Sequence, residues 1–124
     1  MLNLNSLMIG TAQTQVMAEY YKSVFQRDAD MIDGDYYGWS VGNTFFSIGF
    51  HSEVIKEAQD PKRIILNFET KEVKEEFERI KNIKGTVVIK EPYEMGGVWI
   101  ATLADPDGNF FQLMTPWEDM QKEA

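Results

Sequence analysis

The chain has 124 residues with 20 acidic and 12 basic side chains, which gives a formal net charge of −8, and it contains no cysteine. This length predicts one compact domain with a sizeable core, and the missing cysteines exclude disulfides, thiolate metal sites and cysteine nucleophiles. The negative charge disfavours nucleic acid as a partner and favours a cationic ligand. No apolar run approaches the ~20 residues of a membrane span, and residues 1–5 lack signal-peptide features, so we expect a cytoplasmic protein without a membrane partner.

The first half of the sequence predicts a strand, a helix and three further strands. The apolar residues of the helix recur at three- and four-residue spacing and form one stripe: Met17, Tyr20, Tyr21, Val24 and Phe25. Alternating residues on both sides of Gly42-Asn43 predict a hairpin. The expected elements are a strand over 2–9, a helix over 14–26, a short edge strand over 29–32 and paired strands over 36–41 and 44–50.

The second half repeats this order after a polar linker. The expected elements are a strand over 63–69, a helix over 71–82, a strand over 86–90, a loop over 91–97, paired strands over 98–103 and 109–115 and a charged tail over 118–124. The loop contains Gly96 and Gly97, so it is either a mobile lid or an ordinary hairpin link. We therefore expect 1–124 to form one domain of two modules, 1–50 and 63–117, joined by a linker over 51–62.

The repeated element order predicts an α+β fold. It is expected to consist of two tandem βαβββ modules, whose eight strands form a curved mixed sheet with the helices on its outer face. Two helices cannot cover both faces of eight strands. The free face must therefore curl into a cup, meet a partner, or do both.

The segment Asp105-Pro106-Asp107-Gly108-Asn109 predicts a tight turn between the last two strands. Proline presets its own φ, and Gly108 accepts a positive φ without a Cβ clash. The short carboxylate of Asp105 can accept backbone N–H groups within the turn. We interpret Asp105 and Asp107 as turn residues, because a calcium loop needs more oxygen ligands at set spacings.

The tandem modules, residues 105–113 and the paired aromatics within Tyr20–Phe25 together resemble the vicinal oxygen chelate superfamily. Its members include glyoxalase I, extradiol dioxygenases, fosfomycin-modifying enzymes and bleomycin-resistance proteins. The resemblance covers nearly the whole chain. It implies the fold more specifically than the function, because this fold hosts many activities.

Enzymes of this superfamily hold a divalent metal with side chains from four strand positions, usually histidine, glutamate, histidine and glutamate. The resemblance places these positions at Ser6, Ser47, Ile65 and Gln112. Two hydroxyls, an alkyl group and an amide cannot offset the lost hydration of a hard divalent ion. We therefore expect no metal and no other cofactor, which places metal-dependent isomerase, dioxygenase and transferase activities in doubt together.

Strand alternation from these four positions gives the expected wall of the cup. The expected ligand-binding residues are Ser6, Met8, Trp39, Phe45, Ser47, Ile65, Asn67, Trp99, Phe110, Gln112 and Met114. An aromatic and aliphatic wall with scattered hydrogen-bonding groups is typical of a small-molecule pocket. The alternative is that these residues meet a second subunit or fill a core. For Trp39 and Trp99 the pattern leaves pocket wall and core equally open.

His51 is the only histidine, and it is either a general base near the cup or a solvated loop residue. The leading hypothesis is a metal-free small-molecule-binding protein of the glyoxalase/bleomycin-resistance type, acting as a homodimer on an aromatic or cationic ligand. One alternative is a glyoxalase- or dioxygenase-like enzyme with unconventional metal ligands or metal-free acid–base catalysis. The other is a protein-interaction module.

Overall fold

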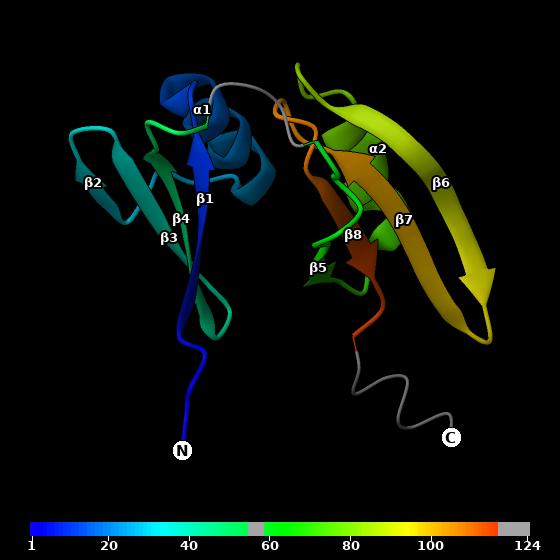
Figure 1. Cartoon of the computed structure of the whole chain (residues 1–124). Helices are drawn as coiled ribbons and strands as arrows, with labels where there is room; N and C mark the ends of the chain where they lie inside the picture. The colour runs from blue at the N-terminus through cyan, green and yellow to red at the C-terminus, as the bar shows by residue number, and fades with distance from the viewer. Residues whose placement is uncertain (55–58, 117–124) are drawn as a thin grey trace. The chain divides into compact units, whose positions relative to one another are not determined.

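A computed structural model describes residues 1–54 and 59–116. The predicted tail over 118–124, Trp117 and residues 55–58 of the predicted linker lie outside the described residues. The chain divides into two compact units, Met1–Glu57 and Ala58–Ala124, which are called here the first and second modules. Each module contains one helix and one four-stranded sheet in its described part (Figure 1). The predicted α+β class with two βαβββ modules is confirmed.

The first module has the predicted element order. Its elements are β1 (Ser6–Thr11), α1 (Thr14–Phe25), β2 (Met31–Asp33), β3 (Tyr36–Val41) and β4 (Thr44–Phe50). The strand order is β1-β4-β3-β2, with β1 parallel to β4 and the other neighbours antiparallel. The β3–β4 hairpin has the predicted bounds. β1 begins later than expected, because its pairing with β4 starts at Ser6 opposite Phe45.

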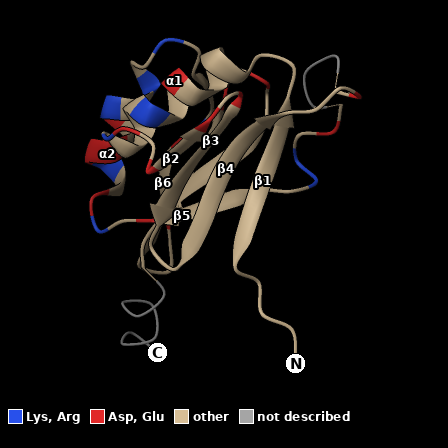
Figure 2. Cartoon of the chain, turned by 90° about the vertical axis from the view of Figure 1, so that its left-hand side faces the viewer, with Lys and Arg blue, Asp and Glu red and all other residues tan. Residues whose placement is uncertain are grey.

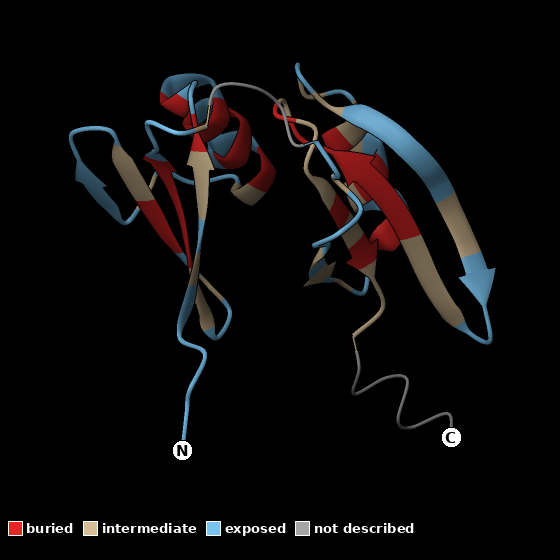
Figure 3. Ribbon diagram, in the orientation of Figure 1, coloured by how far each residue is buried: buried red, intermediate tan, exposed pale blue. Residues whose placement is uncertain are grey.

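An aromatic core joins α1 to the sheet of the first module. The ring of Tyr21 lies 4.7 Å from that of Phe46, and the ring of Phe25 lies 5.6 Å from that of Trp39, measured between centroids. Met17 and Ile48 are fully buried in the same core. Figure 3 shows the buried residues of α1 and β4. The helix therefore covers the sheet face that carries Trp39, Phe46 and Ile48.

The second module repeats the arrangement. Its elements are β5 (Leu66–Glu69), α2 (Val73–Lys81), β6 (Val87–Met95), β7 (Val98–Ala104) and β8 (Phe110–Met114). The strand order is β5-β8-β7-β6, with β5 parallel to β8. The buried helix residues Val73, Phe77 and Ile80 accompany a buried sheet face made of Ala101, Leu103, Phe111 and Leu113. In the described part of the chain, neither helix has the length and hydrophobicity needed to cross a membrane.

The predicted loop over 91–97 is wrong, since β6 continues to Met95. β6 is an edge strand, so Pro92 can sit in it without breaking an inner ladder of hydrogen bonds. Two register shifts, between Val88 and Lys90 and between Lys90 and Tyr93, absorb the irregularity. The segment is therefore half of a hairpin, not a lid, and Gly96 and Gly97 close it with positive φ angles of 61° and 85°.

The helices lie on one face of each sheet, and many of the charged residues lie on the helices. Figure 2 shows Lys, Arg, Asp and Glu on α1, α2 and the connecting segments, whereas β1 and β4 carry none. In each module, the sheet face that its own helix does not cover is called here the helix-free face.

Candidate functional site

The closing turn fixes how β7 and β8 face each other. Asp105 is 1% exposed, and its Oδ1 accepts the backbone N–H groups of Asp107 at 2.9 Å and Asn109 at 3.0 Å. The side-chain amide of Asn109 also donates to both carboxylate oxygens. Gly108 has a φ of 86° and donates its N–H to the Asp105 carbonyl at 2.8 Å. The turn role predicted for Asp105 is confirmed, and the turn sets the register that pairs Thr102 with Gln112.

The helix-free face of the first module carries four of the predicted residues. Paired positions place Ser6 beside Phe45, and Met8 beside Ser47. The next pair across the sheet joins Ser47 to Gly38 on β3. Because paired residues share a face, Ser6, Met8, Phe45 and Ser47 lie together on the side away from α1.

Glycines make room for the larger side chains on this face. A Cβ on Gly38 would lie 2.3 Å from Cζ of Phe45, so the Phe45 ring rests directly on the Gly38 backbone. A Cβ on Gly49 would lie 2.5 Å from the terminal methyl carbon of Met8. Ser47 is 2% exposed, and its hydroxyl donates to the Leu7 carbonyl at 3.3 Å. The face is thus apolar and uncharged around Ser47.

The helix-free face of the second module carries a line of polar side chains across all four strands. Asn67 on β5 pairs with Gln112 on β8, Gln112 pairs with Thr102 on β7, and Thr102 pairs with Lys90 on β6. These four residues are called here the polar row. Within it, the side-chain amide of Gln112 donates to the Thr102 hydroxyl at 3.0 Å. The sequence interpretation included Asn67 and Gln112 but missed Thr102 and Lys90.

Apolar residues border the polar row on both sides. The bordering pairs are Met114 with Ile100 and Ile100 with Tyr93 on one side, and Phe110 with Ala104 and Ala104 with Val87 on the other. The predicted residues Phe110 and Met114 therefore share this face with Gln112 and Asn67. Ring and aliphatic groups beside a polar line provide contact area and orientation in one surface.

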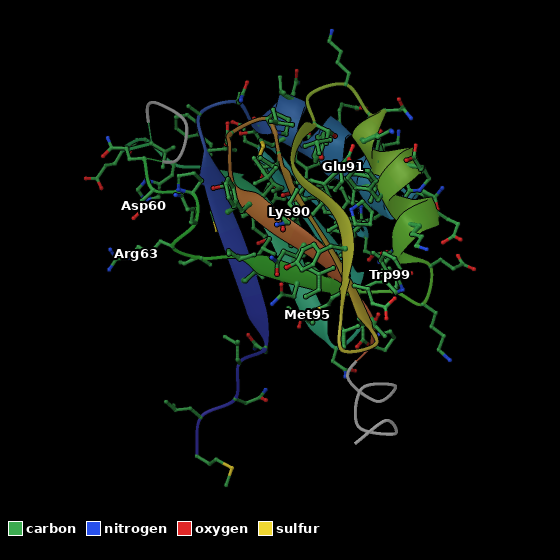
Figure 4. All side chains as sticks on the ribbon, turned by 90° about the vertical axis from the view of Figure 1, so that its right-hand side faces the viewer. Asp60, Arg63, Lys90, Glu91, Met95 and Trp99 are labelled. Atoms are coloured by element: carbon green, nitrogen blue, oxygen red, sulfur yellow. The ribbon has the colours of Figure 1, made fainter. Side chains whose placement is uncertain are left out.

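Lys90 is the one basic residue among the paired residues of this face. Its Nζ lies 4.9 Å from the ring centroid of Tyr93, a cation–π contact that places the ammonium on the face. Figure 4 shows Lys90 and Trp99 on opposite sides of the β6 ribbon, with Trp99 toward the helix. Lys90 is exposed, and it forms no ion pair with any carboxylate of the described residues.

Both tryptophans predicted as pocket-wall candidates lie on the helix side instead. Trp39 pairs with Phe46, is 1% exposed, and donates its indole N–H to the Arg27 carbonyl at 3.1 Å. Trp99 carries the Lys74 ammonium 3.8 Å above its ring and borders a cavity of about 210 Å³ beside α2. Of the two alternatives, pocket wall and core, Trp39 therefore belongs to the core. Trp99 packs beside Lys74 of α2.

Counting residues outward from each hairpin turn is enough to assign both tryptophans to a face of the sheet. A two-residue turn at Gly42-Asn43 pairs Val41 with Thr44, so Trp39 must share the face of Phe46. The same count from the closing turn puts Trp99 on the face of Ala101 and Leu113.

Two further predicted residues lie outside the paired strands. Ile65 immediately precedes β5 and is 37% exposed, so strand alternation does not assign it to a face. His51 follows β4, is exposed, and accepts the Glu53 N–H on its Nδ1 at 3.2 Å. This is the arrangement of a solvated loop residue, the alternative to the general-base role.

The positions that bind metal in the resembling enzymes do not fit a divalent ion here. The Ser6 hydroxyl donates to the Asn5 side chain, the Ser47 hydroxyl donates to a backbone carbonyl, and the Gln112 amide donates to Thr102. Ile65 offers no donor atom. Within 1–54 and 59–116, no group of three or more His, Asp or Glu residues is placed to hold a metal. Neutral groups of this kind do not replace the hydration shell of a hard cation.

Solved structures with the same fold are similar to nearly all of this chain. A glyoxalase/bleomycin resistance protein from Albidiferax ferrireducens T118 matches with a TM-score of 0.74 at 17% identity, over 90% of this chain and 98% of that one. A glyoxalase-related enzyme from Fulvimarina pelagi gives 0.76 at 13% identity, over 94% and 89%. A glyoxalase/bleomycin resistance protein/dioxygenase family enzyme from Burkholderia phytofirmans PsJN gives 0.72 at 22% identity, over 92% and 98%. No family model and no curated protein matches the sequence.

Proposed function

We propose that this chain, which has the vicinal oxygen chelate fold, is a metal-free protein that binds a small organic molecule on its helix-free sheet faces. The observation that carries the proposal is the polar row, in which Gln112 occupies a position that usually supplies a metal-binding glutamate in the resembling enzymes and instead donates a hydrogen bond to Thr102. Binding through hydrogen bonds and apolar contact needs no cation.

The surroundings of the polar row support a ligand with an apolar or aromatic body. Phe110, Met114 and Ile100 lie on the same face and are partly exposed. Aromatic and methionine side chains make favourable contacts with flat rings. The neutral groups of Gln112 and Asn67 would then fix the orientation of the ligand, because amides both donate and accept hydrogen bonds.

The helix-free face of the first module supports the same kind of contact. Phe45 offers a ring that rests on Gly38, and Met8 offers a flexible thioether over Gly49. Neither residue carries a charge. The part of the face around Phe45 and Met8 is therefore suited to contact an apolar surface.

The proposal includes the homodimer expected from the sequence. β6 is an edge strand that is exposed over most of its length (Figure 3). Its residues Val87, Val88 and Ile89 are 55%, 40% and 43% exposed. Unpaired apolar edge strands favour association with another chain, which supports a second copy as partner.

Ligand capture combined with metal analysis tests the proposed function. The native protein is purified without chelators and divided into two portions. One portion is denatured, and the small molecules that it releases are identified by mass spectrometry. The other portion is assayed for bound metals. The proposal predicts a released organic molecule, or a melting temperature raised by aromatic probes, without stoichiometric metal. A stoichiometric divalent ion that leaves when Ser6, Ser47 or Gln112 is replaced by alanine would overturn it.

A matched pair of variants then locates binding. Thr102→Val removes a hydroxyl from the polar row at nearly constant volume, and it should weaken binding of a captured molecule or of the best aromatic probe. Ser23→Ala removes an exposed hydroxyl that bonds the backbone of α1, and it should leave binding unchanged. Equal binding by both variants would show that the polar row is not the site.

A further inference from the structure

Resting on the proposed function, we propose that the second module binds the acidic group of its ligand at the polar row, with Lys90 as the charged anchor. The ligand class is therefore an aryl or alkyl acid, in which a carboxylate sits beside an apolar body. This reverses the cationic ligand expected from the net charge of −8.

The geometry places Lys90 at one end of a continuous line of hydrogen-bonding groups. The row crosses the sheet from Asn67 through Gln112 and Thr102 to Lys90, one residue on each strand. Neighbouring strands lie about 4.8 Å apart, so the row spans roughly 14 Å. That length accommodates a carboxylate at one end and a polar substituent at the other.

Hydrogen-bond donors predominate at the Lys90 end of the row. The Lys90 ammonium has three donor protons and no acceptor. One amide proton of Gln112 goes to the Thr102 hydroxyl, which leaves its second amide proton and the hydroxyl proton of Thr102 to donate elsewhere. The Lys90 ammonium and the hydroxyl of its strand neighbour Thr102 can both donate to the oxygens of an anion, and charged partners strengthen such hydrogen bonds.

The charges on this face also favour an anion. Glu69 shares the face but pairs with Met114 on the β5 side, at the opposite edge of the sheet from Lys90. No member of the row is acidic, and Lys90 forms no ion pair with the described carboxylates. The Tyr93 ring holds the ammonium on the face without neutralising it. The Lys90 ammonium is therefore the formal charge that the row itself carries.

Because the net charge of the chain is negative, a preference for acidic ligands is a specific test of the polar row. Unspecific electrostatic attraction to this protein favours cations over anions, because the summed field is negative. A preference for an acid over a matched cation must then come from a local arrangement of groups, and the polar row supplies one.

Three probes of one shape test the inference: naphthoate, naphthamide and naphthylmethylammonium. Their binding to the full-length protein is measured by ligand-observed NMR, with affinities from titration. We expect naphthoate to bind more tightly than naphthamide by about tenfold, the loss typical of one charge-assisted hydrogen bond. Lys90→Met should remove this preference, Lys90→Arg should keep much of it, and the exposed loop control Lys84→Met should leave it unchanged.

The outcomes separate this inference from the proposed function. If naphthamide or the ammonium probe binds as well as naphthoate, the face still binds small molecules, but the acid assignment is overturned. If naphthoate is preferred and Lys90→Met keeps that preference, Lys90 is not the anchor and the inference is wrong. If none of the three probes binds, this inference is overturned, whereas the proposed function is decided by ligand capture from the native protein.

Discussion

Gln112 on β8 donates its side-chain amide to the Thr102 hydroxyl on β7 across a distance of 3.0 Å. The two residues are directly opposite in the register that the closing turn sets. Superfamily enzymes usually carry a glutamate at the position of Gln112, and there an anionic oxygen would face the metal. Here the same position is part of a neutral hydrogen bond within the sheet.

Replacement of Gln112 tests this relationship. Gln112→Leu should lower the free energy of unfolding by about 1 kcal/mol, because it deletes one hydrogen bond on a half-buried face. Gln112→Glu should cost less, since the Thr102 hydroxyl can donate to the new carboxylate. Neither variant should gain a melting temperature that rises with added Mn²⁺ or Zn²⁺, because Ser6, Ser47 and Ile65 remain uncharged. Urea unfolding and thermal melts measure both effects, and a metal-dependent rise in the wild type would contradict the account.

Asp105 should be the most sensitive residue of the closing turn. Asp105→Ala removes the acceptor of two backbone N–H groups and of the Asn109 amide at a site that is 1% exposed. We expect the free energy of unfolding to fall by about 2 to 3 kcal/mol. Asp105→Asn keeps one acceptor oxygen in place and should cost less. Denaturant unfolding of the two variants tests the difference, and equal losses would show that the acceptor oxygen is not what matters.

Local pairing explains why much of the fold could be predicted from the sequence. The β3–β4 hairpin has the predicted bounds, 36–41 and 44–50, because its turn and both strands are contiguous. The ends of a strand that pairs with a distant segment are harder to predict from the sequence. β5 begins at Leu66, where its pairing with Phe111 begins, and the sequence of residues 63–65 alone still looks like a strand.

The candidate site could be predicted only in part, for the same reason. Gln112, Asn67 and Phe110 follow from strand alternation once one position is assigned. Lys90 does not, because two register shifts separate it from its neighbours on β6, and bulges break the alternation on which the assignment depends. Thr102 was missed, but it can be assigned from the sequence, because counting residues outward from the closing turn pairs it with Gln112.

The contact between Phe45 and Gly38 makes a prediction about the first module. Gly38→Ala places a Cβ 2.3 Å from the Phe45 ring, so the ring must move, and we expect a loss of about 1 to 3 kcal/mol. In a Phe45→Ala background the same change should cost little, because the clash is gone. Gly49→Ala is the control, since the one close contact of its Cβ, at 2.5 Å, is with the flexible end of Met8, and the Tyr36 ring lies at an ordinary 3.5 Å. A double-mutant cycle by urea unfolding measures the coupling, and additive effects would place the ring elsewhere.

The oligomeric state is the next testable property. We expect light scattering coupled to gel filtration to give twice the chain mass of 14.3 kDa. Ile89→Lys puts a charge on the exposed apolar stretch of β6 and should weaken this dimer without unfolding the chain, because Ile89 is 43% exposed. A wild-type mass equal to one chain would contradict the homodimer, and an unaffected dimer in the variant would exclude β6 as its interface.

Asp30 should contribute to the decrease in the free energy of unfolding at acidic pH. The Ser40 backbone N–H donates to its Oδ2 at 2.7 Å and the Arg27 guanidinium contacts both carboxylate oxygens, which together lower the pKa of Asp30 below its ordinary value of 3.8. A depressed native pKa means that the contribution is fully present above about pH 4 and is lost as the pH falls through the native pKa, because the unfolded chain binds the proton first.

Asp30→Asn should therefore flatten the dependence of unfolding free energy on pH below about pH 4, the ordinary range of an aspartate. Ser40→Ala is the matched control: it keeps the backbone N–H that donates to Asp30, so it should preserve the wild-type slope. Urea unfolding at a series of acidic pH values measures the three slopes. If Asp30→Asn and the wild type lose stability in parallel on acidification, the Ser40 and Arg27 contacts are not maintained in solution.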